Sequence, residues 1–498
     1  MISLDVDTLS GRFGEDIIRI KEEFSYPINE DFQLRKLFIP RLDKEAVLFY
    51  VNGLVQGDVI EQSVITPLLK NKTARKGKAT LYKMEQMLPL RGVGKSSDIS
   101  KIVEGIVRGS VALLIEDDDS AYLLNTSTTE HRGIGEPQSE NVIKGPNEGF
   151  VESSITNRSL IRKHVRDPKL LTETMTVGQR TKSDVSIMYI KGIANPAFIE
   201  ELKERIGNLE VDDLQGISVL EQHIEERPYS LLPSILYTER PDRCASFLLE
   251  GHIVVSMDHT PACLVLPVTV WSFFHTAEDF NQRFAFGNFI RLIRLLAVFV
   301  ALLMPSFYIA ITNFHIEMLP TDLVLAIAAT RERVPFPAVV EVLLMELAFE
   351  LLREAGVRIP TPIGPTIGIV GALILGQAAV EAHIISPILV IVIAITGLAS
   401  FAIPDVSFSF AIRISRFIFL FFSMFMGFFG IAVIFTMILA YATTAKSFGV
   451  PFLAPVAPHY RSSKDLIIRP PVWKQWIRPQ HMKPVESVRQ KRKTGSTE

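Results

Sequence analysis

The chain has 498 residues, of which 48% are hydrophobic, and a formal net charge of −2. This length allows two or three domains, and the hydrophobic share is high for a purely soluble protein. The net charge by itself says nothing about nucleic acid, but no basic stripe interleaved with aromatic residues is present before residue 285, which argues against nucleic acid as a partner.

The N-terminal part of the chain alternates charged and apolar residues, as a globular protein does. Residues 1–34 are expected to form an N-terminal arm. The opening sequence, MISLDVDTLSGRFGEDIIRIKEEF, lacks the apolar core of a secretory signal. We therefore expect the first domain to stay on the cytoplasmic side.

Residues 35–130 are predicted to form a first small α/β module. AVLFYVNGLV (46–55) has the pattern of a strand, and VIEQSVITPLLK (59–70) has helical spacing. VALLIEDDDSAYLLNT (111–126) is predicted to be a strand hairpin that turns at its acidic cluster.

A second module is predicted over residues 160–285, after a linker at 131–159 that is rich in Gly, Pro, Ser and Asn. Within it, residues 183–209 indicate a strand, a turn at Asn195-Pro196 and an amphipathic helix, and residues 247–270 indicate a strand hairpin.

The two modules show no pattern of an enzyme or of a metal site. GVGKSS (92–97) resembles the end of a phosphate-binding loop, but Pro89 occupies the position where that loop needs a glycine, so an exposed basic loop is expected. The two cysteines, Cys244 and Cys263, are too few for a zinc site or a disulfide framework, and we expect buried free thiols. We predict no catalytic residues, no metal and no cofactor.

Residues 286–447 hold long uncharged runs and are predicted to be an α-helical transmembrane domain. Each run is long enough to cross a hydrocarbon core of roughly 30 Å. The four predicted spans are 295–312, 359–380, 384–404 and 417–445. The segment 335–356 is hydrophobic but carries four glutamates, so we expect an amphipathic helix, interfacial or re-entrant.

Basic residues on the flanks predict the orientation. Arginines precede the first span, at Arg283, Arg291 and Arg294, and residues 448–498 form a basic tail that contains RQKRK. Both ends are therefore expected inside, which four crossings satisfy. The cost is that the arginines at 331, 333, 353 and 358 would lie in an outer loop, against the usual bias.

Small residues recur at every fourth position of the second predicted span. A helix places them on one face, where another helix can approach closely; they are Gly364, Gly368, Ala372 and Gly376. Tight packing within one chain and contact between copies of the chain are both open.

Polar residues near the end of this span turn to another face. Gln377 and Glu381 lie four residues apart, about 100° round the helix from Gly376. They are candidates for an ion pathway, because a carboxylate is tolerated in a bundle interior or a water-filled path. The alternative is that Glu381 and His383 already lie in the outer interface.

Glu346 and Glu350 are four residues apart on the amphipathic segment, on a face shared with Arg353 and Glu354. They could form a ring of carboxylates at a pore once subunits assemble. The alternative is a solvated face on which Glu350 pairs with Arg353. We favour the ring for Glu346 and Glu350, and the solvated face for Glu354.

Long stretches of this sequence resemble the spore germination receptor A-subunit family, over about residues 30–460. The resemblance rests on VLFYVNGLV, on KGPNEGFVESSITNRSLIRK, on PFLAPVAP and on the core LLMELAFELLREAGVRIPTPIGPTIGIVGALILGQAAVEAHIISPILVIVIAITGLASFAIP. Within the family, FAIPDVSFSFAIR and TPIGPTIGIVGALILGQAAV are most similar to the stage V sporulation protein AF branch. His383 departs from the family pattern, in which a smaller residue such as glycine is expected.

The resemblance implies an inner spore-membrane protein with a cytoplasmic N-terminal domain that works in germination. Subunits of this family assemble with a transporter-like subunit and a lipoprotein subunit, and are thought to oligomerise around a cation pathway that nutrients open. The AF branch is thought to amplify the response by ion release.

We therefore expect an α+β cytoplasmic region of two small α/β modules, followed by an α-helical transmembrane domain of about four spans plus an amphipathic or re-entrant helix. The first functional hypothesis is a homo-oligomeric ion-conducting subunit in contact with membrane lipid and other germination membrane proteins. The second is a non-conducting scaffold that holds partner proteins at the membrane.

Overall fold

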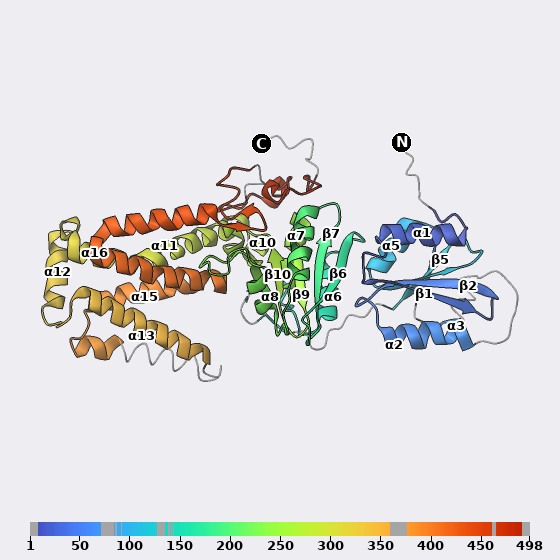
Figure 1. The fold of residues 1–498 in the computed structure, drawn as a ribbon, viewed down its shortest axis with the longest axis horizontal. Helices are drawn as coiled ribbons and strands as arrows, with labels where there is room; N and C mark the ends of the chain where they lie inside the picture. The colour runs from blue at the N-terminus through green and yellow to red at the C-terminus, as the bar shows by residue number, and fades with distance from the viewer. Residues whose placement is uncertain are drawn as a thin grey trace.

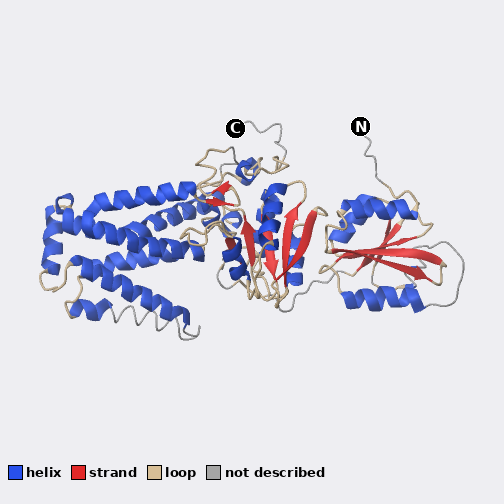
Figure 2. Ribbon diagram, in the orientation of Figure 1, coloured by secondary structure: helices blue, strands red, loops and turns tan. Residues whose placement is uncertain are grey.

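The computed structural model describes most of the chain as two sheet-containing modules followed by a helical bundle (Figure 1). The described residues are 8–70, 84, 87–90, 92–126, 135–137, 140, 142, 144–358, 376–460 and 465–490. Figure 2 shows strands in the two modules, and helices joined by loops in the described part of the bundle.

The first module is a five-stranded antiparallel sheet with helices on both faces (Figure 1). Its strands are β1 (Phe32–Ile39), β2 (Lys44–Val51), β3 (Val93–Ser96), β4 (Ser110–Ile115) and β5 (Ala121–Asn125). Helices α1 (Phe13–Glu23) and α5 (Ile99–Val107) cover one face, and α2 (Gly57–Val59), the π-helical η1 (Ile60–Ile65) and α3 (Thr66–Lys70) cover the other. The predicted strand, helix and hairpin of this module are confirmed.

Strand β4 is apolar from Val111 to Ile115 because both faces of this stretch are covered. Val111, Leu113 and Ile115 lie in the core under α2 to α3, whereas Ala112 and Leu114 lie in the core under α1 and α5. Alternate residues of a strand point to opposite faces, so two cores require a continuous apolar run.

The second module has a sheet with the same strand order as the first. The order is β1-β2-β4-β5-β3 in the first sheet and β6-β7-β9-β10-β8 in the second. Its elements are α6 (Ser154–His164), β6 (Leu170–Val177), β7 (Ser183–Ile190), α7 (Pro196–Gly207), α8 (Ile217–Ile224), β8 (Leu236–Thr238), α9 (Pro241–Glu250), β9 (Ile253–Met257) and β10 (Cys263–Leu266). The predicted strand and helix are confirmed as β7 and α7. The hairpin begins at Ile253 rather than at residue 247, because residues 247–250 form the end of α9. Cys244 and Cys263 are buried free thiols, as predicted.

A buried ion pair joins the two modules. Asp31, next to β1, accepts hydrogen bonds from Arg158 (2.7 Å) and from Nε of Arg162 (3.0 Å), both on α6. Arg162 also donates to Leu170 O and to the Thr172 hydroxyl of β6. Asp31 and Arg162 are each 3% exposed. Helix α6, which follows the linker, is therefore held against the first module by a buried ion pair.

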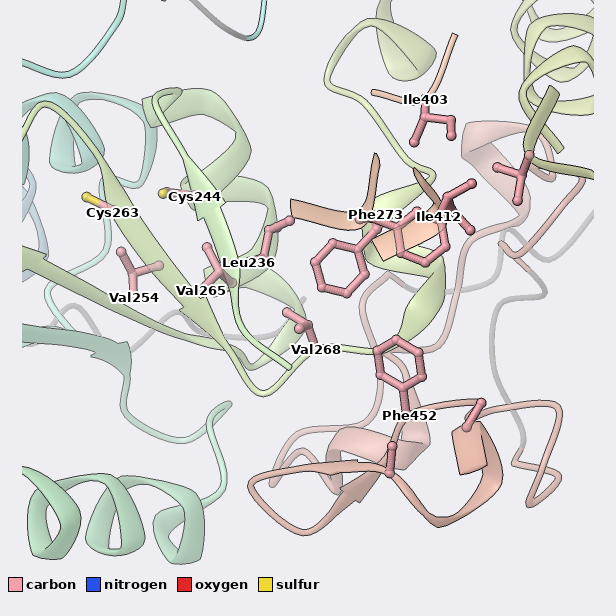
Figure 3. Packing of buried hydrophobic residues seen from close by; sticks show 14 of the residues in the cluster. Leu236, Cys244, Val254, Cys263, Val265, Val268, Phe273, Ile403, Ile412 and Phe452 are labelled. Carbon is pink, nitrogen blue, oxygen red and sulfur yellow. The ribbon is translucent and has the colours of Figure 1, made fainter. Parts of the chain in front are cut away.

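The core of the second module continues into the helical bundle without a break (Figure 3). The joint between the module and the bundle is built from aromatic rings. The ring centre of Phe273 in η2 (Val270–Phe273) lies 5.9 Å from that of Phe408 and 6.2 Å from that of Phe452. Val268 and Ile412 belong to the same cluster. The module and the bundle therefore share one hydrophobic core at this end.

The bundle consists of α11 (Phe284–Phe314), α12 (Thr321–Arg331), α13 (Ala338–Arg358), α15 (Pro387–Phe401) and α16 (Val406–Thr444). Among the described residues, α11 and α16 are the helices long and apolar enough to cross a membrane, and α15 is a shorter apolar helix. The predicted spans 295–312 and 384–404 correspond to α11 and α15. Most of the predicted span 359–380 lies outside the described residues.

Helix α16 folds back on itself at Gly427. This glycine has φ 56° and ψ −135°, which interrupts the helix, and a Cβ added to Gly430 would lie 2.3 Å from the carbonyl oxygen of Phe422. Residues eight apart in a straight helix are about 12 Å apart along its axis, so this approach requires a hairpin. Both arms return to the second module, at Phe408 and at Phe452 just after the helix. The predicted single span 417–445 is thus corrected to two antiparallel arms that begin at Val406.

Helix α13 packs along the bundle, and its interfacial or re-entrant position in a membrane stays a prediction. Val342 and Met345 pack against Tyr308 and Ile309 of α11 and Leu389 of α15. The number of membrane crossings stays a prediction, because residues 359–375 are outside the described part.

The C-terminal segment returns to the second module. Phe448, Val450 and Met482 belong to the core of that module, and Nε of Arg478 donates to Leu249 O (2.9 Å). The second module and the tail therefore lie at the same end of the bundle, in agreement with the prediction that both share one side of a membrane.

Two of the arginines that gave the predicted orientation are buried in ion pairs at this end. Arg291 and Arg294 of α11 bind Asp279 of the short helix α10 (Glu278–Asn281), at 3.0 and 2.8 Å. Arg291 also pairs with Asp465 of the tail. These ion pairs attach the start of α11 to α10 and to the tail. They do so in addition to any effect on the orientation of the helix in a membrane.

The carboxyl group of Glu221, on α8, makes the free energy of unfolding depend on pH. Burial raises the pKa of Glu221 on α8 to about 8, and the charges of Glu225 and Asp405 act in the same direction. Between its ordinary pKa and about 8 the folded chain holds a proton that the unfolded chain releases, so stability falls as pH rises through this window.

We expect Glu221→Gln to raise the unfolding temperature at pH 9 and to leave it nearly unchanged at pH 4.5, because glutamine copies the protonated carboxyl. Thermal unfolding of the detergent-solubilised chain at the two pH values measures this. Exposed Glu210, changed to Gln, is the control. A gain of equal size at both pH values would contradict the assignment.

Candidate functional site: charged residues inside the helical bundle

Helix α13 buries glutamates and exposes leucines. Glu341 and Glu346 are fully buried. The exposed side chains on the same helix include Leu343, Leu344, Leu347 and Leu351. A helix at a water interface has the reverse arrangement. The outward leucines suit contact with lipid, and the inward carboxylates require partners inside the bundle.

Glu350 meets two arginines of the first arm of α16. Its carboxylate accepts hydrogen bonds from Arg413 and from Nη2 of Arg416, the latter at 2.7 Å. Arg353, one turn further along α13, has Nη1 3.8 Å from Glu350 Oε1. One carboxylate is therefore shared by three guanidinium groups.

Glu346 lies one turn before Glu350 and faces the same arginine. Its Oε2 is 3.1 Å from Nη2 of Arg416, and Glu346 and Arg416 are 0% and 1% exposed. Among the described residues neither oxygen of Glu346 makes a well-directed hydrogen bond. The cluster of Glu346, Glu350, Arg353, Arg413 and Arg416 holds two carboxylates and three guanidinium groups. We call it the arginine–glutamate cluster.

Arg353 is held by the helix α15 and by aromatic rings. It donates to the Ser400 hydroxyl, and its guanidinium lies 5.1 Å from the centre of the Phe349 ring and 4.7 Å from that of Phe401. The cluster therefore ties together α13, α15 and the first arm of α16.

A second buried carboxylate lies near the other end of the bundle. Glu341 Oε2 accepts a hydrogen bond from the Ser386 amide (3.0 Å), and its Oε1 is 3.4 Å from Nε of Arg331. The Tyr308 hydroxyl is 3.4 Å from that of Ser386. The side chain of Glu341 thus caps the start of α15 by accepting a hydrogen bond from the backbone N–H of Ser386.

Gln377 and Glu381 lie apart from the arginine–glutamate cluster and are exposed. The Gln377 amide donates to Glu381 Oε1 (2.8 Å), which confirms that the two share a helix face. Gly376 is buried, with the position of its missing Cβ 3.7 Å from Val390 of α15. The other predicted packing residues, Gly364, Gly368 and Ala372, lie outside the described residues.

In this single chain the four candidate pathway residues form two groups. Glu346 and Glu350 face arginines of their own chain rather than solvent, and the predicted Glu350–Arg353 pair is present. Glu354 is exposed and pairs with Arg358 (2.7 Å), as the alternative prediction has it. Whether any of them lines a pathway stays a prediction.

Arg413 and Arg416 are the residues that sequence reasoning missed. The predicted span began at 417 in order to leave both arginines outside, since charges in a membrane helix are costly. The signal was present in FAIRISRF, where two arginines three apart fall on one helix face among apolar residues. Their partners lie more than 60 residues earlier, so the pairing needs the fold.

His383 adopts a backbone conformation that glycine favours. Its φ is 54°, in the left-handed region, which costs a side-chain-bearing residue roughly 1 kcal/mol. This is the position where the family pattern predicts a smaller residue.

We expect His383→Gly to stabilise the chain by about 0.5–1 kcal/mol, since glycine adopts positive φ without steric penalty. The unfolding temperature in detergent is the measurement, and His383→Ala, which keeps the Cβ, is the matched control. A larger gain with alanine than with glycine would contradict the strain argument.

Among the described residues, no group of three or more His, Cys, Asp and Glu is placed to hold a metal ion.

Comparison with known proteins identifies relatives over nearly the whole length. The model of the Bacillus/Clostridium GerA spore germination protein family matches residues 19–481. The Spore germination protein KA of Bacillus subtilis (strain 168) is 38% identical over 484 residues, which cover 97% of this chain and 89% of that protein. Spore germination protein A1 of the same organism is 39% identical, over 79% of this chain and 84% of that protein.

One solved structure also matches. The crystal structure of the N-terminal domain of the A subunit of the Bacillus megaterium spore germinant receptor GerK3 is 26% identical, with a TM-score of 0.41. The match covers 53% of this chain and 97% of the solved one.

Proposed function

Since the chain belongs to the Bacillus/Clostridium GerA family of spore germination proteins, we propose that it is a non-enzymatic subunit of an oligomeric complex that conducts ions across the inner membrane of the spore during germination. The N-terminal modules would lie on the cytoplasmic side. Other germination membrane proteins are its expected partners. The assignment to the AF branch, which would amplify the response, stays a prediction.

The observation that carries this proposal is the arrangement of side chains on α13, which is the reverse of that on a helix at a water interface. Leucines such as Leu347 and Leu351 face outward while Glu346 and Glu350 face inward. Lipid around the bundle accounts for the leucines. An inert anchor has no use for buried carboxylates, which cost free energy even when paired, so their presence supports a role beyond anchoring.

Gln377 and Glu381 are the candidates that fit a pathway between subunits. Both are exposed in the single chain, and their hydrogen bond holds the carboxylate at a fixed place on the helix. In an oligomer such a face could line water rather than lipid. Glu346 and Glu350 would contribute only after the arginine–glutamate cluster rearranges, because Arg413 and Arg416 neutralise them.

Potassium efflux from liposomes that contain the purified full-length chain tests the proposal. We expect efflux, reduced in Glu381→Gln and unchanged in Glu354→Gln, which removes an exposed charge from the same domain. Liposomes that stay impermeant with the wild-type chain, whether alone or assembled with other germination proteins, would overturn it.

The internal pairing of Glu346 and Glu350 favours a second candidate, a non-conducting scaffold. In that case the buried charges specify how the helices pack, and the two modules hold partner proteins. Impermeant liposomes together with partner binding through residues 1–285 would support it.

A further inference from the structure

A cavity of about 270 Å³ lies where the second module, the short helix α10 and the C-terminal tail meet. Its walls include Phe247 of α9, Trp271 of η2, Phe280 of α10 and His481 of η5 (Gln480–Met482). Pockets that bury small molecules are typically apolar with a few convergent polar groups, and they often lie between domains.

Two polar atoms in this wall lack partners among the described residues. The indole Nε1 of Trp271 is a buried donor without an acceptor, and Nδ1 of His481 is buried without a partner. The His481 side chain as a whole is only 7% exposed. Buried groups of this kind normally carry a hydrogen bond, so both atoms have unused hydrogen-bonding capacity in residues that line the cavity.

The other two histidines of the wall offer acceptor atoms. His252 Nδ1 is 2.6 Å from Pro267 O, and His275 Nε2 is 2.7 Å from Leu466 O. A carbonyl only accepts, so these nitrogens carry the protons, and the second nitrogen of each ring keeps a free lone pair. Burial lowers the pKa of His252 to about 3 and that of His481 to about 4, so the rings are neutral near pH 7.

The charged residues of the wall already have partners. Their ion pairs are Asp242 with Arg240, Arg243 with Glu140, Glu250 with Arg489, and Asp465 with Arg291. A net charge on a ligand would therefore be buried without a free counter-charge, which is unfavourable.

From this arrangement we propose that the cavity binds a small uncharged aromatic molecule that carries both N–H donors and a carbonyl acceptor, as a primary aromatic amide does. The carbonyl oxygen accepts from Trp271 Nε1, the amide N–H groups donate to free imidazole nitrogens, and the ring packs against Phe247 and Phe280. Because the wall comes from the second module, α10 and the tail, the bound molecule stabilises the contact among the three.

Benzamide is the probe, and benzoate and benzylamine are its charged counterparts of similar shape. Calorimetric titration of the detergent-solubilised full chain is expected to show saturable binding of benzamide, and binding of each charged analogue weakened by about tenfold or more. Benzamide is also expected to raise the unfolding temperature.

Trp271→Phe keeps an aromatic ring and removes the donor, so benzamide affinity should fall by about tenfold. The matched control is Trp473→Phe, because Trp473 is 71% exposed and outside the cavity. Absence of saturable benzamide binding to the wild-type chain overturns the proposal. So does benzoate or benzylamine binding as tightly as benzamide, or equal affinity of the Trp271→Phe and Trp473→Phe chains.

Discussion

Replacing Glu350 by glutamine is expected to destabilise the helical bundle by about 3–5 kcal/mol, the usual cost of breaking a buried ion pair from one side. Glutamine has nearly the same shape but no charge. Arg416 would then keep Glu346 as its counter-charge, whereas Arg413 would lose the carboxylate that it pairs with. The unfolding temperature and the fraction of folded protein extracted in detergent measure the loss.

Glu354→Gln is the matched control on the same helix. Glu354 pairs with Arg358 at the surface, four residues away, and such pairs contribute about 0.5 kcal/mol or less. The double variant Glu350→Gln with Arg413→Gln should recover part of the loss, because it removes one unpaired guanidinium group. Equal effects of Glu350→Gln and Glu354→Gln would show that the cluster does not hold the bundle.

Gly430→Ala is expected to open the hairpin of α16, with a loss of about 1–3 kcal/mol or more. The added methyl group would lie 2.3 Å from a backbone carbonyl oxygen of Phe422 and 3.1 Å from Cβ of Met426. A backbone atom cannot rotate away as a side chain can, so the two arms must separate.

The control for this variant is Gly356→Ala on α13, where an added Cβ meets nothing within 4 Å. Alanine favours helix over glycine, so Gly356→Ala should stabilise by up to about 1 kcal/mol. Unfolding temperatures of the two variants in the same detergent decide the matter. If Gly430→Ala is tolerated as well as Gly356→Ala, the arms do not pack as closely as the structure has them.

Local patterns predicted the soluble half better than the bundle. The hairpin at 111–126 and the strand and helix at 183–209 were recognised because periodicity and turn residues act over short distances. The order of the strands was not predictable, because β3 pairs at the far edge with β5, a contact between segments that no local pattern encodes.

In the bundle, hydrophobicity identified apolar stretches but not how they turn. The uncharged run 417–445 gave no sign of the turn at Gly427, which depends on a close approach between residues 422 and 430. The glutamates of α13 were recognised as unusual, but their pairing with Arg413 and Arg416 could not be predicted, because only the fold brings these arginines to them.

The joint at Phe273 has a mechanical consequence. The second module touches the start of α11, the start of α16 through Phe408, and the chain just after α16 through Phe452. A rigid rotation of this module would therefore displace these three helix ends together. It would move them relative to the opposite end of the bundle, where Phe314 packs on Gly427.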